Sequence, residues 1–298
     1  MDSPKLHFHI NEKTCILCGM CHKVCPASII GQKSDKSVFF IEERIDLCVK
    51  CGQCMAVCPT KSVEAADLKY GADVLDSEKN DLTYPQFQNF LLHRRSIRHF
   101  QDKSIPDEMI QKILDSISTA PYGVDINKVE ITVVNNRSII EKALPIMSEK
   151  FKELGKSMHN SILRWIISKM ISEEEYASVN NFLLPHLDRG LYDIEKGEDE
   201  ITRNAPCLLL FHGGKKAEEH TIDSHIYLTY AFLAAHSLGL GATVIGLVPP
   251  VVNRSHELRT LFQLPDDNEV VCSMILGFPQ HKFHKTIFRK REKVTWIR

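Results

Sequence analysis

Cysteine is the residue whose spacing in this chain most directly indicates chemistry. Eight of the ten cysteines fall in two segments, residues 15–26 and 48–59, and each segment reads C-x2-C-x2-C-x3-C-P. Every cysteine of the first segment recurs in the second at one constant offset, the one that relates Cys15 to Cys48, and so does the closing proline. Thiolates bind zinc and iron–sulfur clusters, and paired thiols form disulfides, so the spacing must distinguish three kinds of site.

The doubled spacing predicts two [4Fe–4S] clusters of the kind held by bacterial ferredoxins. Three cysteines separated by two residues each wrap one cluster, and the fourth lies past a short turn and reaches the other cluster. The first cysteine set, predicted to hold one cluster, is Cys15, Cys18, Cys21 and Cys58. The second cysteine set is Cys48, Cys51, Cys54 and Cys25.

Zinc and disulfides fit this pattern less well. A structural zinc ion takes four ligands in all, usually as two pairs with a longer spacer, whereas each segment carries four cysteines by itself. Disulfide frameworks are typical of small secreted chains, and this chain of 298 residues begins MDSPKLHFHINEK, without the apolar segment of a secretion signal. The other two cysteines, Cys207 and Cys272, lie in apolar runs and are predicted to be buried core thiols.

Length and composition predict a globular protein of about two domains. Hydrophobic residues make up 43% of the chain, charged residues 25%, and the formal net charge is −1, which gives no electrostatic basis for nucleic-acid binding. No run of about 18 apolar residues occurs, so no membrane span is expected. We therefore expect a protein of a reducing cytoplasm.

The cysteine motifs place a ferredoxin domain at residues 1–70. Residues 71–84 are polar and lack periodicity, so they are interpreted as a linker to a second domain at residues 85–298. Within that domain, residues 148–200 are interpreted as a helical insertion that forms a lid or a dimer arm, with simple core padding as the alternative. Its segment 161–171 is apolar with a helical period and could lie on a membrane surface, but a buried lid or dimer helix is favoured.

The mixture of helix and strand patterns in the second domain predicts an α+β fold with a helix-rich core. Helices are expected at residues 85–100, 105–120 and 224–241. The last of these is almost wholly apolar and should be the central core helix. Strands are expected within residues 128–135, 206–213, 242–248 and 269–279.

Two basic clusters lie far apart in the second domain. One, HRRSIRHF, spans residues 93–100 at the end of an expected helix, and the other, FRKRE, spans residues 288–292. Guanidinium groups bind phosphate with bidentate geometry. Two such clusters meeting on one phosphate would form a mononucleotide site, whereas the alternative is a solvated basic surface.

The second domain resembles the FMN-dependent nitroreductase family. RRSIR at a helix end, APYG after the next helix, NAPCLLL, AAHSLGLGATVIG, and GFP before a basic tail occur in the order found in that family. The whole chain is similar to the branch that carries a two-cluster ferredoxin domain in front. The resemblance implies a homodimer with each FMN at the subunit interface.

The resemblance also implies which residues contact FMN. The family's basic motif, glycine segment and basic tail correspond to Arg94, Arg95, Ser96 and Arg98, to Ile245 and Gly246, and to Arg289 and Arg291. Arg98 would lie near the pyrimidine end of the flavin, where a positive charge stabilises the reduced ring. The tail arginines would hold the phosphate, and the backbone at Gly246 would approach flavin N5.

The chain departs from the family at one contact. It carries Asp125 where the family often has an asparagine that contacts the flavin, and Asn127 where the family has a glutamine. An ionised aspartate cannot donate a hydrogen bond, so either residue could provide this contact. Tyr122 replaces a small residue and could line the substrate side. No residue is assigned as a catalytic acid.

Together these patterns predict an FMN- and iron–sulfur-dependent oxidoreductase. Electrons from a one-electron donor would pass through the clusters to FMN and on to a small electron-poor substrate, such as a nitro compound or a quinone. The donor could be reduced ferredoxin, flavodoxin or NAD(P)H. The alternatives are a flavin-dependent dehydrogenase or reductive dehalogenase on the same fold, and a non-enzymatic electron carrier.

Overall fold

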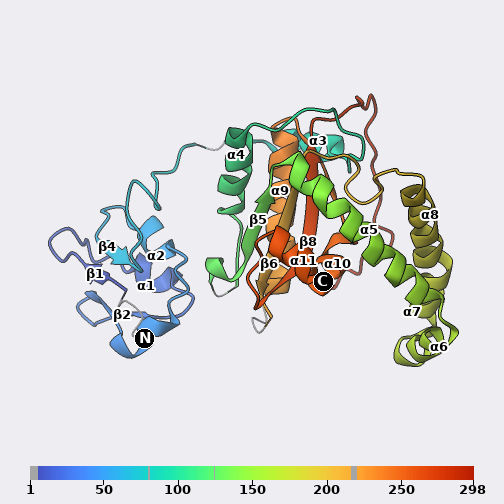
Figure 1. Ribbon diagram of the computed structural model, residues 1–298. Helices are drawn as coiled ribbons and strands as arrows, with labels where there is room; N and C mark the ends of the chain where they lie inside the picture. The colour runs from blue at the N-terminus through green and yellow to red at the C-terminus, as the bar shows by residue number, and fades with distance from the viewer. Residues whose placement is uncertain (1–5, 80, 124, 216–219) are drawn as a thin grey trace. The chain divides into compact units, whose positions relative to one another are not determined.

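The computed structural model describes residues 6–79, 81–123, 125–215 and 220–298. The chain divides into two compact units, Met1–Leu82 and Thr83–Arg298, which we call the N-terminal and C-terminal units. Figure 1 shows the N-terminal unit in blue and the C-terminal unit in colours from teal to red, and each unit is described by itself.

The N-terminal unit is built from the internal repeat. One small antiparallel sheet pairs β1 (Phe8–Ile10) with β4 (Val63–Ala65), and another pairs β2 (Ile30–Gln32) with β3 (Val38–Phe40). The offset that relates the two cysteine motifs also carries helix α1 (Met20–Val24) onto α2 (Gln53–Ala56), and strand β2 onto β4. Each copy of the cysteine motif therefore leads from a short helix into a strand.

Residues 71–74, expected to begin the linker, close a turn on the N-terminal unit. The Gly71 N–H donates a hydrogen bond to the Val74 carbonyl oxygen at 3.0 Å. The Val74 side chain packs against the core that contains Ile29, Ile30 and Met55. The packed chain thus continues past residue 70, because an apolar side chain in the polar stretch has a core to cover.

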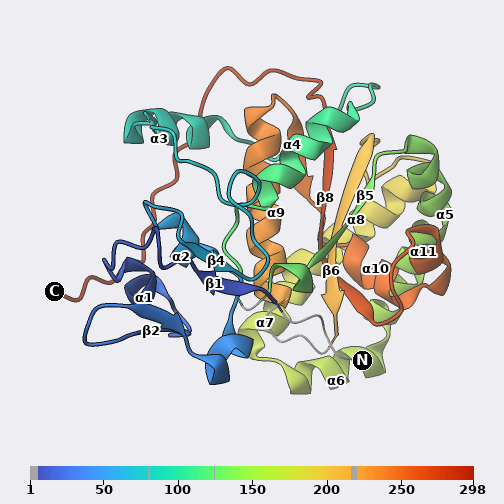
Figure 2. The same cartoon turned by 90° about the vertical axis from the view of Figure 1, so that its left-hand side faces the viewer.

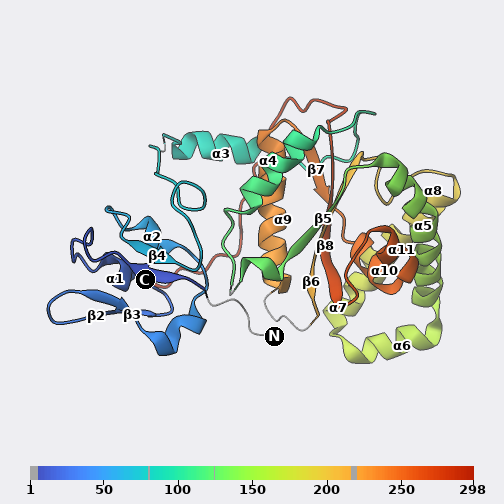
Figure 3. The same ribbon diagram turned by 60° about the vertical axis from the view of Figure 1, so that its left-hand side comes forward.

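The C-terminal unit is centred on a four-stranded antiparallel sheet in the order β5-β6-β8-β7. The strands are β5 (Glu130–Val134), β6 (Cys207–Gly214), β7 (Gly241–Val244) and β8 (Asn268–Gly277). Helices α4 (Asp107–Ile117) and α9 (His220–Ser237) cover one face, and α5 (Arg137–His159), α10 (Val248–Arg254) and α11 (His256–Leu261) cover the other (Figure 1 and Figure 3). This arrangement confirms the predicted α+β fold.

The central strand β6 packs against both helical layers. Its residues Cys207, Leu209 and Phe211 point into the core shared with α4 and α9. Leu208 and Leu210 point into the core shared with α5 and α10. Successive side chains of a strand alternate between its faces, so a strand buried on both sides reads as one continuous apolar run.

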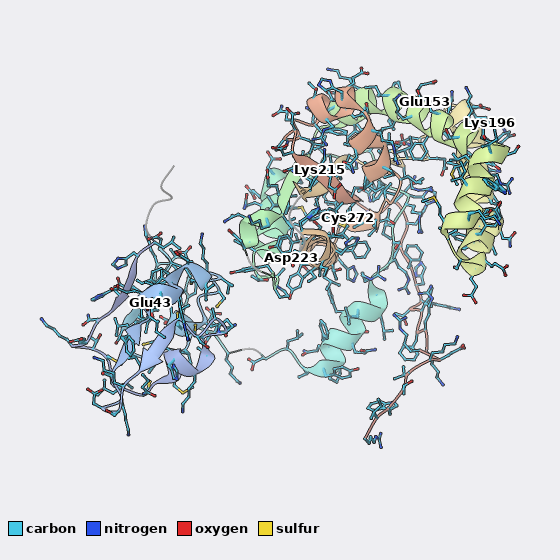
Figure 4. The ribbon with its side chains drawn as sticks, turned by 90° about the horizontal axis from the view of Figure 1, so that it is seen from below. Glu43, Glu153, Lys196, Lys215, Asp223 and Cys272 are labelled. Carbon is cyan, nitrogen blue, oxygen red and sulfur yellow. The ribbon has the colours of Figure 1, made fainter. Side chains whose placement is uncertain are left out.

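The two cysteines outside the motifs are buried in this unit, as the sequence predicts. Burial, followed by the charge of Asp107, raises the pKa of Cys207 to about 12, and burial alone does the same for Cys272. Figure 4 labels Cys272 on β8 and Asp223 on α9. The Cys272 thiol donates to the Ser224 carbonyl at 3.4 Å, so these two elements are in direct contact.

Helix α3 (Tyr84–His93) is shorter than the helix expected over residues 85–100, so that prediction is wrong at its end. The following residues pair with the sheet instead of continuing the helix. The Ile97 N–H donates to the Ala242 carbonyl at 2.8 Å, and Ser96 forms a parallel bridge with Ala242. The first arginine cluster therefore lies on an extended segment beside β7.

The insertion is helical. It contains the end of α5, α6 (Ser161–Met170), α7 (Glu173–Ser178), a π-helical turn (Val179–Leu183) and α8 (Leu184–Glu195). Figure 2 shows α6 and α7 at the edge of the unit, and Figure 4 labels Glu153 on α5 and Lys196 just after α8. Helix α6 exposes Ile162, Trp165 and Met170 by 71%, 63% and 78%, so it is not a core helix of the single protomer.

No helix in the described ranges is long and apolar enough to cross a membrane.

Candidate cluster and flavin sites

The backbone repeats in detail around the two cysteine motifs. Left-handed conformations occur at equivalent positions of the two copies, at Leu17 and Lys50, Gly19 and Gly52, and Ser28 and Lys61. At both glycines φ is 68°, immediately before the short helix of each motif. Left-handed residues among right-handed ones turn successive N–H groups toward one concave side. Each motif therefore curls its chain around a point, as binding of a many-atom cluster requires.

The structure brings the cysteine side chains together in two crossed sets. The pKa of the Cys21 thiol is raised by burial and, less strongly, by the other three members of the first cysteine set. The pKa of Cys54 is raised to about 12 by burial and then by the other three members of the second cysteine set. Cys58 thus lies with the first motif, and Cys25 lies with the second.

The separation of the sulfur atoms distinguishes a cluster from a single zinc ion. Four thiolates at about 2.3 Å from one zinc ion lie about 3.8 Å from one another. Among the described residues, only Asp193, Glu198 and Glu200 place three candidate ligand atoms within 4.8 Å of one another. No three motif sulfurs are that close, although the members of each set interact electrostatically. The sets fit a cluster of several iron atoms, which holds its ligands further apart.

Apolar side chains and backbone N–H groups complete the surroundings of the sulfurs. A cavity beside the second cysteine set is lined by Ala27, Ile29, Ala66 and Leu68. The Cys25 sulfur accepts the Ile29 N–H at 3.4 Å, and the Cys58 sulfur accepts the Ser62 N–H at 3.3 Å. Hydrogen bonds to sulfur and exclusion of water are two of the factors that set the reduction potential of a cluster.

The two basic clusters of the C-terminal unit meet. The Arg94 guanidinium lies over the Phe232 ring, 4.7 Å from its centre. Burial lowers the pKa of Arg94, and the nearby charges of Arg95 and Arg289 lower it further. None of the ion pairs formed between described residues involves these arginines. The fold thus gathers positive charge from both ends of the unit without a neutralising carboxylate, which favours binding of an anion.

A cavity of about 250 Å³ lies beside the first basic segment, between it and residues 279–283, which precede the second basic cluster. Its lining includes His93, Arg95 and Ile97 from the first segment, His236 from α9, and His281 and Phe283 from the C-terminal tail. Arg95 also connects the segments, because it donates to the Leu92 carbonyl at 2.7 Å and to the Lys285 carbonyl at 3.0 Å. The guanidinium of Arg95 therefore donates hydrogen bonds to backbone carbonyls, whereas that of Arg94 is available to a ligand.

Ile245 and Gly246 directly follow the edge strand β7. The Ile245 N–H donates to the Ser273 carbonyl at 3.0 Å, and the Ile245 carbonyl accepts the Ser273 hydroxyl at 2.6 Å. A Cβ added at Gly246 would have no atom of the described chain within 4 Å. The backbone is thus fixed on one side, and open space for a ligand lies on the other.

Asp125 and Asn127 lie together at the 3₁₀ turn Ile126–Lys128. The Asp125 carboxylate accepts the backbone N–H of Asn127 at 2.9 Å and its side-chain amide at 3.2 Å. The preceding loop is fixed by the buried Asp223 carboxylate, which accepts the Gly123 N–H at 3.1 Å. Asp125 therefore acts as an acceptor within its own turn, and the Asn127 amide oxygen remains able to accept from a ligand.

Ser96, Arg98 and Arg291 are exposed. One terminal nitrogen of Arg98 donates to the Ser96 carbonyl at 3.5 Å. Arg291 lies on the C-terminal tail and is not among the charges that shift the pKa of Arg94. The structure thus brings Arg94 and Arg289 together but does not bring Arg291 to the same point.

Comparison with known proteins matches both units. The sequence model of the nitroreductase family matches residues 91–278, and that of the 4Fe-4S dicluster domain matches residues 14–63. The chain belongs to the nitroreductase family. It is an oxidoreductase with a 4Fe-4S dicluster domain at its N-terminus, which confirms the resemblance found in the sequence.

Individual relatives agree with this membership. A Methanothermobacter thermautotrophicus protein named as an NADH dehydrogenase/NAD(P)H nitroreductase is 28% identical over 186 residues, covering 62% of this chain and 73% of that protein. The iodotyrosine deiodinase 1 of Rattus norvegicus is 23% identical over 209 residues, covering 65% of this chain and 62% of that protein. A crystal structure of a nitroreductase with bound FMN from Bacteroides fragilis has a TM-score of 0.53 at 21% identity, covering 71% of this chain and 98% of that chain, and confirms the fold.

Two parts of the nitroreductase unit's arginine site were missed in the sequence. Phe232 and His236 lie on α9, which the apolar pattern identified only as a core helix. Burial lowers the pKa of His236, although a hydrogen bond with the Phe90 carbonyl opposes this, and the charges of Arg94 and His93 lower it further. The AAHSLGLG stretch that contains His236 contributed to the family resemblance, but the sequence does not give the contact of α9 with the arginines, because that contact depends on how the helix packs.

Tyr70 was also missed, in the N-terminal unit. Its hydroxyl donates to the Met55 carbonyl at 3.2 Å. Burial, followed by the charges of Cys58 and Cys54, raises the pKa of Tyr70 to about 12. One tyrosine thus lies near both cysteine sets, and it lies outside the two cysteine motifs.

Proposed function

We propose that this nitroreductase-family protein passes electrons from a one-electron donor through two [4Fe–4S] clusters to FMN and on to a small electron-poor substrate. The observation that carries the proposal is the presence, in one chain, of two crossed cysteine sets and a nitroreductase unit with an unneutralised arginine site. When bound, clusters supply one-electron transfer and FMN links it to two-electron chemistry. Nitro compounds and quinones are the proposed substrate class, because both accept electrons readily from a reduced flavin.

In this proposal the two cysteine sets hold the clusters. The support is the crossed grouping, the sulfur separation that is too wide for one zinc ion, and the matching N–H···S bonds to Cys25 and Cys58. Anaerobically purified protein should therefore contain about eight iron atoms per chain, four for each cluster, with matching sulfide. Zinc in place of iron would contradict the assignment.

Arg94 and Arg289 are proposed to bind the FMN phosphate. Burial lowers the pKa of Arg94, repulsion from Arg95 and Arg289 lowers it further, and an anion between Arg94 and Arg289 would relieve that repulsion. Arg98 is exposed and would place positive charge beside the flavin ring, and the open space beside Gly246 would admit the ring edge.

We also propose a homodimer, because the C-terminal unit exposes several large apolar side chains. The C-terminal tail exposes Phe288, Trp296 and Ile297 by 67%, 75% and 95%, and α6 exposes Trp165. Large apolar side chains at such positions are typical of an association surface. Light scattering of the holoprotein tests this, and a monomer at micromolar concentration would contradict it.

Anaerobic reduction tests the electron path. Reduced ferredoxin, flavodoxin, NADH and NADPH are compared by following flavin absorbance in the wild-type protein and in Cys54→Ser. We expect a one-electron donor to reduce FMN in the wild type and much more slowly in the variant. Equal reduction by NAD(P)H in both proteins, with no reduction by ferredoxin, would show that electrons do not enter through the clusters.

Reductive dehalogenation is a second candidate. The observation that favours it is the likeness to the iodotyrosine deiodinase of Rattus norvegicus. Turnover of a nitroaromatic, a quinone and a halogenated phenol by the reduced protein separates the candidates. Halide release without nitro or quinone reduction would favour dehalogenation, and turnover of none of them would favour an electron carrier.

A further inference from the structure

The two cysteine sets have different surroundings at their fourth cysteines. The Thr60 hydroxyl lies 3.6 Å from the Cys58 sulfur. The Ser62 hydroxyl lies 2.7 Å from the Thr60 hydroxyl, and the Thr14 hydroxyl lies 2.8 Å from that of Ser62. Three hydroxyl groups therefore form a chain that ends on one sulfur.

The internal repeat shows that the second cysteine set lacks this chain. In the other copy of the repeat, the positions equivalent to Thr14, Thr60 and Ser62 are occupied by Leu47, Ala27 and Ile29. Each hydroxyl thus has an apolar counterpart, although the backbone N–H···S bonds to Cys58 and Cys25 are equivalent, at 3.3 and 3.4 Å. The hydroxyl chain is therefore one difference between the two sites, and Lys50 beside the second set, where the first motif has Leu17, is another.

The number of protons fixes the direction of the chain. Each hydroxyl has one proton and a ligating thiolate has none, so the Cys58 sulfur can only accept. The three contacts of the chain are all satisfied when Thr14 donates to Ser62, Ser62 to Thr60, and Thr60 to the sulfur. The competing bond from Thr14 to the Asn11 carbonyl is longer, at 3.3 Å, and a negatively charged acceptor favours the chain. Ser62 is only 1% exposed, so water does not compete for its hydroxyl.

We infer that the Thr60 hydroxyl raises the reduction potential of the cluster held by the first cysteine set above that of the cluster held by the second. The inference rests on the proposed assignment of clusters to the two sets. Reduction adds negative charge to a cluster and its thiolates, and a hydrogen bond to sulfur stabilises that charge. The cavity beside the second set is lined mostly by apolar residues such as Ala27 and Ile29, which disfavour the added negative charge, and Lys50 is its one charged lining residue. A single electron supplied by dithionite would therefore reside on the cluster of the first set.

Substitution of Thr60 in the full-length holoprotein tests the inference. Thr60→Val keeps the shape and removes the hydroxyl, and Thr60→Ser keeps the hydroxyl as the matched control. A redox titration followed by electron paramagnetic resonance gives both cluster potentials. In Thr60→Val we expect the equilibrium constant for reduction of the higher-potential cluster to fall about tenfold, which is about 59 mV for one electron, while the lower potential is unchanged. Thr60→Ser should keep both wild-type potentials.

The reciprocal variant is Ala27→Thr, which places a hydroxyl at the equivalent position beside Cys25. It should raise the lower potential and leave the higher one unchanged. The inference is overturned if the two wild-type clusters titrate together, if Thr60→Val moves neither potential or the lower one, or if Thr60→Ser behaves like Thr60→Val. Absence of reducible clusters from the wild-type protein would instead overturn the cluster assignment itself, and the inference with it.

Discussion

Arg94 and Arg95 are adjacent in the sequence but have different tasks. Arg95 donates to the carbonyls of Leu92 and Lys285, which joins the end of α3 to the C-terminal tail. Arg94 instead lies over the Phe232 ring near Arg289. The guanidinium of Arg95, which donates hydrogen bonds to backbone carbonyls, stabilises the fold. The guanidinium of Arg94, which packs on an aromatic ring near other positive charges, is placed to bind an anion.

This difference predicts the effect of three arginine substitutions. A hydrogen bond to a charged group contributes about 1.5–3 kcal/mol, so Arg94→Ala and Arg289→Ala should each weaken FMN binding by about ten- to a hundredfold. Arg95→Ala should mainly lower the melting temperature. The measurements are FMN titration of the apoprotein and thermal unfolding. If Arg95→Ala weakens FMN as much as Arg94→Ala, the division of tasks is wrong.

A buried histidine predicts how stability depends on pH. His212 is 2% exposed, and its ring nitrogens contact the Thr132 hydroxyl at 3.0 Å and the Asn268 amide at 2.9 Å. Burial lowers its pKa, against a smaller opposing effect of Glu130. The unfolded chain, with a histidine pKa of about 6.5, then binds more protons than the folded one as the pH falls below that value. Stability contributed by neutral His212 is therefore present above about pH 6.5 and is lost as the pH decreases.

The corresponding test compares the melting temperature of the wild type and His212→Gln between about pH 5 and pH 7.5, on either side of the ordinary histidine pKa. The variant should be less stable at the upper pH, because the buried hydrogen bonds are altered, and its melting temperature should fall less on acidification. His225→Gln is the control, since His225 is exposed. An unchanged pH slope in His212→Gln would show that other groups cause the acid sensitivity.

Two glycines let the segment that carries Ile97 and Phe100 lie against the sheet. A Cβ on Gly241 would come within 2.7 Å of the Ile97 side chain, and one on Gly277 within 2.6 Å of Phe100. Both glycines lie on neighbouring strands, β7 and β8. The close approach of this segment therefore positions Arg98, whereas Arg94 is the residue that caps the end of α3.

Substitutions at Gly241 and Gly246 distinguish a glycine needed for packing of the chain from one needed for contact with FMN. Gly241→Ala overpacks the Ile97 site, so it should lower the free energy of unfolding by about 1–3 kcal/mol and also weaken FMN binding. Gly246→Ala meets no described atom within 4 Å, so it should keep the stability of the apoprotein and weaken only FMN binding. Urea unfolding and FMN titration measure both effects. Wild-type FMN affinity in Gly246→Ala would remove Gly246 from the proposed site.

The two units of the chain have separate cores. The buried cluster of the N-terminal unit and its packed neighbours lie within residues 8–74, and those of the C-terminal unit lie within residues 97–278. A chain that begins at Thr83 should therefore fold, bind FMN and dimerise, and dithionite should reduce it. It should lose reduction by donors that require the clusters. The measurements are FMN content, light scattering and anaerobic reduction, and an aggregated product without FMN would contradict the independence of the units.

Features that depend on short stretches of chain can be predicted from the sequence alone. The cysteine sets follow from ligand spacing within each short motif and from a repeat that the backbone reproduces at Gly19 and Gly52. Strands β6 and β8 and helix α9 follow from apolar runs long enough to require burial. Even the asymmetry at Thr60 and Ala27 is visible once the two copies are aligned.

Contacts between segments far apart in the chain can be seen only in the folded protein. The helix expected through Phe100 ends at His93, because hydrogen bonds to Ala242 compete with helix propensity, which is a weak local preference. The meeting of Arg94 with Arg289 and the reach of Thr14 to Ser62 across the repeat have no local cause. They arise because burial of the apolar faces fixes where each backbone runs, and the polar side chains are carried into contact by that packing.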